Sequence, residues 1–183
     1  MTALAYLGPP GTFTEEALLT LSIAEGADLV PMPTIPAVVR AVVAGDAEAG
    51  LVPIENSIEG SVNITLDTLA FEADDPIQIR AEVVRPIRHA LLGQPGARLG
   101  DISDVVSHPH ATAQCRGFLE RALPQASVRA ANSTAEAARD AAARGRGWAA
   151  SGVPIAAELH GLVVLEADIE DRDENATPVG RSR

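Results

Sequence analysis

The stretch DVVSHPHATAQCRGFLERALPQASVRAANSTAEAARDAAARGRGWAAS, residues 104–151, decides the fold class of this chain. Short apolar runs of strand-like composition alternate in it with longer, Ala-rich runs of helical spacing. That alternation predicts an α/β protein. We expect strands at Asp104–Ser107, Ser127–Ala130 and Gly147–Ser151, a helix from Pro109 to about Leu123, and a second helix over Thr134–Arg144.

The same alternation continues on both sides of this stretch. Glu15, three residues after Thr12, fits a capping box at a helix start. Val62, Leu66 and Leu69 share one face of a later helical run. We expect strands at Thr2–Leu7, Ala49–Ile54, Ile77–Val84 and Ile87–Leu92, helices from Thr12 and over Ile35–Ala44, Ser61–Phe71 and Pro154–Leu159, and a final apolar run at Gly161–Leu165.

The domain organisation follows from a change of pattern in the middle of the chain. Arg85-Pro86 separates two strand-like runs, and a proline removes a ladder donor and suits a bend between lobes. We therefore expect two α/β lobes. The first holds about residues 1–76 plus 163–183, and the second holds about residues 80–160. The chain would cross between them twice, which leaves a cleft of the kind where ligands bind.

Composition limits the class of ligand and the compartment. The net charge of −11 argues against nucleic acid, whose binding needs a basic surface. An anionic ligand would need local donors, such as helix N-termini, to overcome this charge. Cys115 is the only cysteine and the first ten residues do not resemble a signal peptide, so we expect a cytoplasmic protein. No apolar run is long enough to span a membrane.

Polar clusters stand where three expected strands give way to helices: Gly8–Glu16, Ser107–His110 and Asn132–Glu136. Each cluster offers hydroxyls and backbone N–H groups at a helix start, the donors that a carboxylate needs. Ordinary helix caps at Thr12, Ser107 and Ser133 explain the same residues. The pattern by itself therefore leaves both interpretations open.

A fourth segment, Pro53–Val62, places Glu55-Asn56-Ser57 directly after a strand-like run. Asn and Ser side chains both donate and accept hydrogen bonds, and strand C-termini are where open α/β sheets bind ligands. A solvated turn is the alternative. His108 and His110 have no cysteine or carboxylate at ligand spacing beside them, so we expect no metal site and no other cofactor.

Taken together, these motifs resemble those of prephenate dehydratase. The similarity covers nearly the whole chain in the correct order. It implies a two-lobed architecture like that of type II periplasmic solute-binding proteins, with the active site in the interlobe cleft, and a homodimer as the assembly. The segments that carry the resemblance are Gly8–Ala17, Pro53–Val62, Ser107–His110 with Gln114-Cys115, Asn132–Ala138, Ala156–Leu162 and Asn175–Thr177.

The resemblance also implies roles for the matching residues and a reaction, the conversion of prephenate to phenylpyruvate with loss of water and CO₂. Thr177 would hydrogen-bond to the leaving oxygen. The catalytic residues implied are Thr177, Asn56, Gln114 and Glu55, and those that bind substrate are Thr12, Phe13, Thr14, Ser57, Ser107, His108, Ser133 and Thr134.

This sequence departs from the family pattern at three places. His110 stands where the family usually has Gln, and His160 where it has Tyr. Thr177 is followed by Pro178 instead of Arg-Phe and a strand, and proline cannot donate to a ladder. The phenylalanine-sensing C-terminal domain of the family is not part of this sequence. The altered tail leaves two other functions open, a decarboxylase acting on prephenate or its amino analogue, and a solute-binding module without catalysis.

Overall fold

A computed structural model describes residues 2–56, 60–72 and 77–171 of the chain. The chain divides into two compact units, and the α/β class expected from the sequence is confirmed. Unit 1 comprises residues 1–9, 13–86 and 175–183, and unit 2 comprises residues 10–12 and 87–174. None of the helices within the described ranges is both long and apolar enough to cross a membrane.

Unit 1 is built on a parallel three-stranded sheet in the order β2-β1-β3. The helix α2 packs against β1 and β3, where the absence of a side chain at Gly50 allows the close approach of Val38. Leu4 and Tyr6 of β1 are buried with Leu18 of α1. The elements of this part are β1 (Ala3–Leu7), α1 (Phe13–Leu19), a 3-10 turn (Ser22–Ala24), β2 (Asp28–Met32), α2 (Ile35–Val43) and β3 (Ala49–Leu51).

The rest of unit 1 differs from the expectation. The strand expected at Ala49–Ile54 ends at Leu51, and Glu55–Asn56 (β4) forms a separate ribbon with Gly60–Ser61 (β5). The helical run is divided into α3 (Asn63–Asp67) and a π-helical turn, Thr68–Glu72. The buried residues of this run are Thr65 and Thr68, while Leu66 on the apolar face is exposed. Their hydroxyls satisfy backbone carbonyls, which makes burial of these polar groups possible.

The expected strand at Ile77–Val84 is also wrong. These residues pair with no described strand, and Ile79 and Val84 are exposed. Their β-branched composition favours a strand, but composition alone does not supply a partner that would bury them. The segment leads into unit 2 at Ile87.

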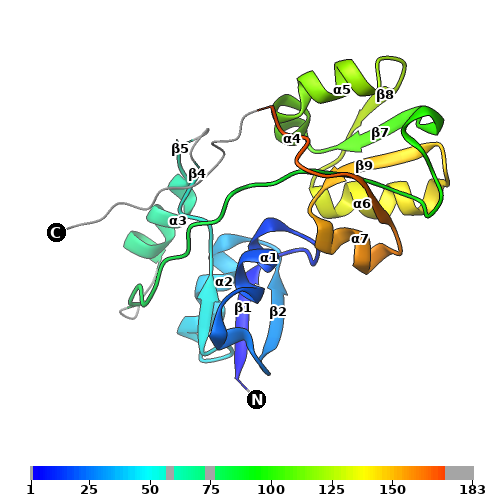
Figure 1. Ribbon diagram of the computed structural model, residues 1–183. Coiled ribbons are helices and arrows are strands. Elements are labelled where there is room, and N and C mark those ends of the chain that lie inside the picture. Colours follow the sequence, from blue (N-terminus) through cyan, green and yellow to red (C-terminus); the bar gives the residue numbers. More distant parts are fainter. Residues whose placement is uncertain (1, 57–59, 73–76, 172–183) are drawn as a thin grey trace. The chain divides into compact units, whose positions relative to one another are not determined.

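Unit 2 is built on a five-stranded mixed sheet in the order β10-β6-β9-β7-β8. The strands β9, β7 and β8 run parallel, and β6 is antiparallel to both of its neighbours. Figure 1 shows α4 and α5 on one side of this sheet and α6 on the other. The strands are β6 (Ala90–Gly93), β7 (Asp104–Ser107), β8 (Ser127–Ala130), β9 (Trp148–Gly152) and β10 (Val163–Glu166), and the helices are the 3-10 turn Leu99–Asp101, α4 (Pro109–Gln114), α5 (Arg116–Ala122), α6 (Thr134–Arg144) and α7 (Pro154–His160).

Two expectations for unit 2 need correction. The helix expected from Pro109 to about Leu123 is broken at Cys115, whose side chain is fully buried in the core beneath α5. Residues 163–183 were assigned to the first lobe. The described part of this segment begins with β10, which pairs with β6, so residues 163–171 belong to unit 2.

Candidate active site

The parallel strands of unit 2 bring several of the predicted site residues to one edge of the sheet. Because β7, β8 and β9 are parallel, their C-terminal ends lie together, and α4, α6 and α7 all begin there. This edge is where open α/β sheets bind their ligands, next to the N–H groups of helix starts. Ser107 ends β7 and His108 precedes α4, while Ser133 precedes α6 and Thr134 is its first residue.

The start of α6 is capped as the sequence predicted. Ser133 Oγ accepts a hydrogen bond from Glu136 N at 3.0 Å, and Glu136 Oε2 accepts one from Asn132 N at 2.9 Å. Gly11, at a φ of 84°, packs against α6, since a Cβ there would lie in van der Waals contact with Ala135 Cβ, at 3.5 Å. The predicted residue Thr12 thus follows a segment that packs against the first turn of α6.

Ser107 has a different role from the helix cap that we considered as an alternative. The cap of α4 is His108, whose Nδ1 accepts a hydrogen bond from His110 N at 3.3 Å. Ser107 is fully buried at the end of β7 and hydrogen-bonds to Ser151 of the neighbouring strand β9. Ser107 Oγ also donates a hydrogen bond to the carbonyl oxygen of His108, at an O–O distance of 3.1 Å. Ser107 therefore joins the two strand ends.

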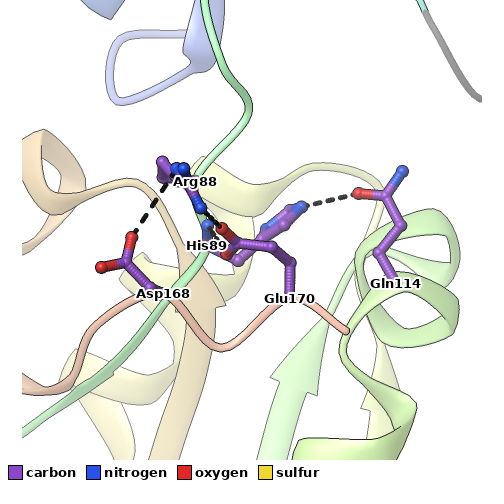
Figure 2. A network of polar contacts seen from close by, with 5 residues as sticks. All are labelled: Arg88, His89, Gln114, Asp168 and Glu170. Atoms are coloured by element: carbon purple, nitrogen blue, oxygen red, sulfur yellow. Dashed lines mark hydrogen bonds and ion pairs between the residues drawn. The ribbon is translucent and has the colours of Figure 1, made fainter. Parts of the chain in front are cut away.

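Gln114, at the end of α4, belongs to a polar network that the sequence did not reveal (Figure 2). Its Oε1 lies 2.8 Å from Nε2 of His89, at the entrance to β6. Glu170 Oε2 accepts the backbone N–H of His89 at 2.8 Å, and Glu170 Oε1 accepts from Arg88 Nη1 at the same distance. Asp168 adds a longer ion pair with Arg88, at 3.9 Å.

Burial distinguishes this network from surface pairs. The Glu170 side chain is 2% exposed, and His89 is also 2% exposed. Burial lowers the pKa of His89 below its ordinary value, against smaller raising effects from the Gln114 hydrogen bond and the Glu170 charge. The His89 ring is therefore neutral near pH 7 and carries a single N–H.

The segment Asp168–Asp171 holds both halves of this network by its backbone as well. Ile169 N donates to His89 O at 3.0 Å, and Asp171 N donates to Gln114 O at 2.7 Å. The Asp171 carboxylate accepts the N–H groups of Gly117 and Phe118 in the first turn of α5. A Cβ at Gly117 would lie 2.7 Å from Asp171 Oδ1, so a glycine is needed for this close approach. One segment thus fixes His89, Gln114 and the start of α5.

The other predicted residues that the structure describes belong to unit 1. Phe13 and Thr14 open α1, and Glu55 and Asn56 form β4 opposite Ser61 and Gly60. All four side chains are half-buried. The neighbouring Val62 N donates to Ile54 O, which fastens this ribbon to the start of α3. Ser57 and Thr177 lie outside the described residues, so their predicted roles stay predictions.

Two further groups near these motifs have shifted pKa values. Burial raises the pKa of the Glu16 carboxyl, an effect that Arg85 partly opposes. Burial also raises the pKa of Cys115 to about 12, so its thiol stays protonated and is not a nucleophile near neutral pH. Cys115 therefore serves the core, as its small apolar character favours.

Comparison with known proteins places these motifs in a family. The family model described as prephenate dehydratase matches residues 4–178. A prephenate dehydratase of Amycolatopsis methanolica is 45% identical over 171 residues, which cover 93% of this chain and 54% of the relative. The chain thus spans about half the length of this relative.

Two solved structures are similar over nearly the whole chain. The prephenate dehydratase of Arthrobacter aurescens, in complex with L-Phe, has a TM-score of 0.86 at 37% identity and covers 96% of this chain and 57% of its own. A protein described as a novel type of quorum quenching acylase has a TM-score of 0.80 at 30% identity and covers 95% of this chain and 61% of its own. The fold is therefore shared with these proteins.

Proposed function

Since the chain belongs to the prephenate dehydratase family, we propose that it converts prephenate to phenylpyruvate with loss of water and CO₂. The observation that carries this proposal is the match over residues 4–178, which includes every motif that the sequence presented. In this reaction the ring carboxylate leaves as CO₂, and its bonding electron pair enters the ring. The ring C–O bond breaks as the hydroxyl accepts a proton and departs as water.

Aromatisation drives this reaction, so the protein has to hold the carboxylates and supply a proton at the hydroxyl. Helix starts support the first task, the binding of the carboxylates. The first turn of α6, with Ser133 and Thr134, provides N–H groups and hydroxyls for a carboxylate in a protein whose net charge of −11 otherwise repels anions. We assign Thr12, Phe13, Thr14, Ser57, Ser107 and His108 to substrate binding as well.

We assign the second task, the supply of a proton at the departing hydroxyl, to Thr177, Asn56, Gln114 and Glu55. A threonine hydroxyl is a weak acid, so Thr177 would act by a positioned hydrogen bond to the departing oxygen. The Thr177→Ala variant should then reduce turnover by about 10²-fold or more, and Asn56→Ala tests the second motif in the same way. Steady-state assays with prephenate measure both effects, and unchanged turnover removes the residue from the mechanism.

The products of one incubation decide between the candidate functions. Prephenate is added to the full chain, and the products are identified by mass and ultraviolet absorbance. Phenylpyruvate supports the proposed function. A dihydro-hydroxyphenylpyruvate would identify a decarboxylase, and binding without turnover would identify a solute-binding module.

The resemblance also supports a cytoplasmic homodimer as the working form. A single buried thiol, Cys115, suits a reducing compartment. Light scattering of the purified chain measures the mass in solution, and a monomer at assay concentration with full activity would refute the dimer.

A further inference from the structure

The contact between His89 and Gln114 carries an inference that rests on the proposed function for what Gln114 does. Gln114 can present either the oxygen or the nitrogen of its amide to a ligand, and the two choices have opposite polarity. Whatever holds the amide therefore decides whether Gln114 offers the substrate a hydrogen-bond donor or an acceptor. In this protein the group that holds it is the ring of His89, with Nε2 2.8 Å from Oε1.

We propose that His89 is the positioning residue of Gln114: its Nε2–H holds the amide oxygen, so that the amide NH₂ of Gln114 is the group directed to the substrate. An amide oxygen only accepts, so this contact requires the proton on Nε2. The reverse orientation would direct the Gln114 oxygen to the substrate, and an oxygen that only accepts could not donate a hydrogen bond to the departing hydroxyl.

The surroundings of the ring favour a fixed orientation. His89 is 2% exposed, so water does not compete for its Nε2–H. The ring is neutral because burial lowers its pKa, and a neutral ring has one N–H to commit. The contact therefore joins a donor and an acceptor in a buried place, where a misplaced partner costs most.

The backbones of both residues are held by one segment, which makes the side-chain contact reproducible. Glu170 and Ile169 bind the N–H and the carbonyl of His89, and Asp171 N binds the carbonyl of Gln114. Such a supporting shell is what keeps a functional side chain within the narrow range that catalysis tolerates.

A matched pair of variants tests the contact by activity. In His89→Gln the side-chain amide reaches about the position of Nε2, whereas in His89→Asn the shorter amide does not. We expect His89→Gln to keep kcat/KM for prephenate within about 3-fold, and His89→Asn to lose about 10-fold or more. Equal losses in the two variants would overturn the proposal, and circular dichroism with thermal unfolding confirms that both are folded.

A double-mutant cycle separates positioning from a general structural effect. If His89 acts through Gln114, His89→Asn should reduce kcat/KM no further in a Gln114→Ala background. A second loss of about 10-fold in that background would show that His89 acts independently of Gln114, and would overturn the proposal.

Measuring the tautomer of His89 tests the inference without an activity assay. Long-range ¹H–¹⁵N correlation spectra of the ¹⁵N-histidine-labelled full chain distinguish its four histidines, and the signal missing from His89→Gln identifies His89. We expect the neutral Nε2–H form at pH 7.5, with a proton that exchanges faster in Gln114→Ala. A neutral Nδ1–H form or a charged ring would overturn the proposal. A wild-type chain that shows the Nε2–H form but does not convert prephenate would contradict the proposed function alone.

Discussion

The two ends of the sheet in unit 2 both carry a polar cluster, and the two clusters differ in burial. At one end, His89, Gln114 and Glu170 form the network of Figure 2, and the carboxylate of Glu170 is 2% exposed. At the other end, where β7 and β9 begin, Arg129 pairs with Asp104 at 2.7 Å with its own side chain 57% exposed. Both ion pairs join an exposed arginine to a more buried carboxylate, but Glu170 is 2% exposed and also binds the backbone of the buried His89, whereas Asp104 is 15% exposed.

Burial decides which of these contacts contribute to stability. Arg129 and Arg144 also stack on Trp148, at 5.0 and 4.4 Å from the ring, so the exposed cluster is well connected. Exposed pairs nevertheless contribute little, because water solvates either partner when the other is removed. In the first cluster, removal of Glu170 or Gln114 leaves a polar group of the buried His89 without water to replace the lost partner. We therefore expect function and stability to depend on the first cluster and hardly on the second.

Glu170→Ala should have the largest effect on stability. The substitution removes the acceptor of both Arg88 and the His89 N–H, and the N–H is then left without its acceptor. We expect the free energy of unfolding to fall by about 2 kcal/mol or more. Urea unfolding followed by circular dichroism measures it, and a loss below that of Asp104→Ala would contradict the contrast between the two ends.

The pH dependence of stability should show an intermediate effect. His89 has a lowered pKa when folded and an ordinary value near 6.5 when unfolded, so the unfolded chain binds the proton more readily. The contribution of His89 to the free energy of unfolding is therefore complete above about pH 6.5. It falls as the pH drops from there toward the pKa of the folded state. The slope from this residue is at most about 1.4 kcal/mol per pH unit. His89→Gln should show a shallower decline between pH 7 and 5, and identical declines would refute a neutral buried ring.

Asp104→Ala should have the smallest effect. The pKa of the Asp104 carboxyl is lowered mainly by the hydrogen bond from Arg129, whose side chain is 57% exposed, with a further hydrogen bond from Ser103. We expect no measurable change in the free energy of unfolding, because water solvates the exposed arginine when its partner is removed. A loss as large as that of Glu170→Ala in the same urea experiment would show that the exposed cluster is a structural element after all.

The sequence predicted the parts of the fold that local pattern determines. The expected bounds of β7, β8 and α6 match the structure, and Ser133 caps α6 as expected, because the cap, the apolar period and the breakers all lie within a few residues. The break at Cys115 was not predicted, since no glycine or proline marks it. The exposed run Ile77–Val84 was predicted as a strand, since composition does not reveal whether a partner strand exists.

In the candidate site, too, some residues could be predicted from the sequence and others could not. Gln114 and Ser107 were predicted through family motifs, and the structure gives both of them buried or half-buried hydrogen-bond partners. The partners themselves were not predicted. Arg88 and Glu170 are 82 residues apart in sequence, and Gln114 is 25 residues from His89. Contacts of this kind depend on how strands are ordered in the sheet, which no short motif encodes.

Turnover in two matched variants tests the central claim most directly. Gln114→Ala and Arg129→Ala each remove one partner of a short side-chain contact from the same unit, at the buried and the exposed cluster respectively. With prephenate as substrate, we predict that kcat/KM falls by about 10²-fold in Gln114→Ala and stays within about 2-fold in Arg129→Ala. Equal values for the two variants would contradict the assignment of the active site to the buried cluster.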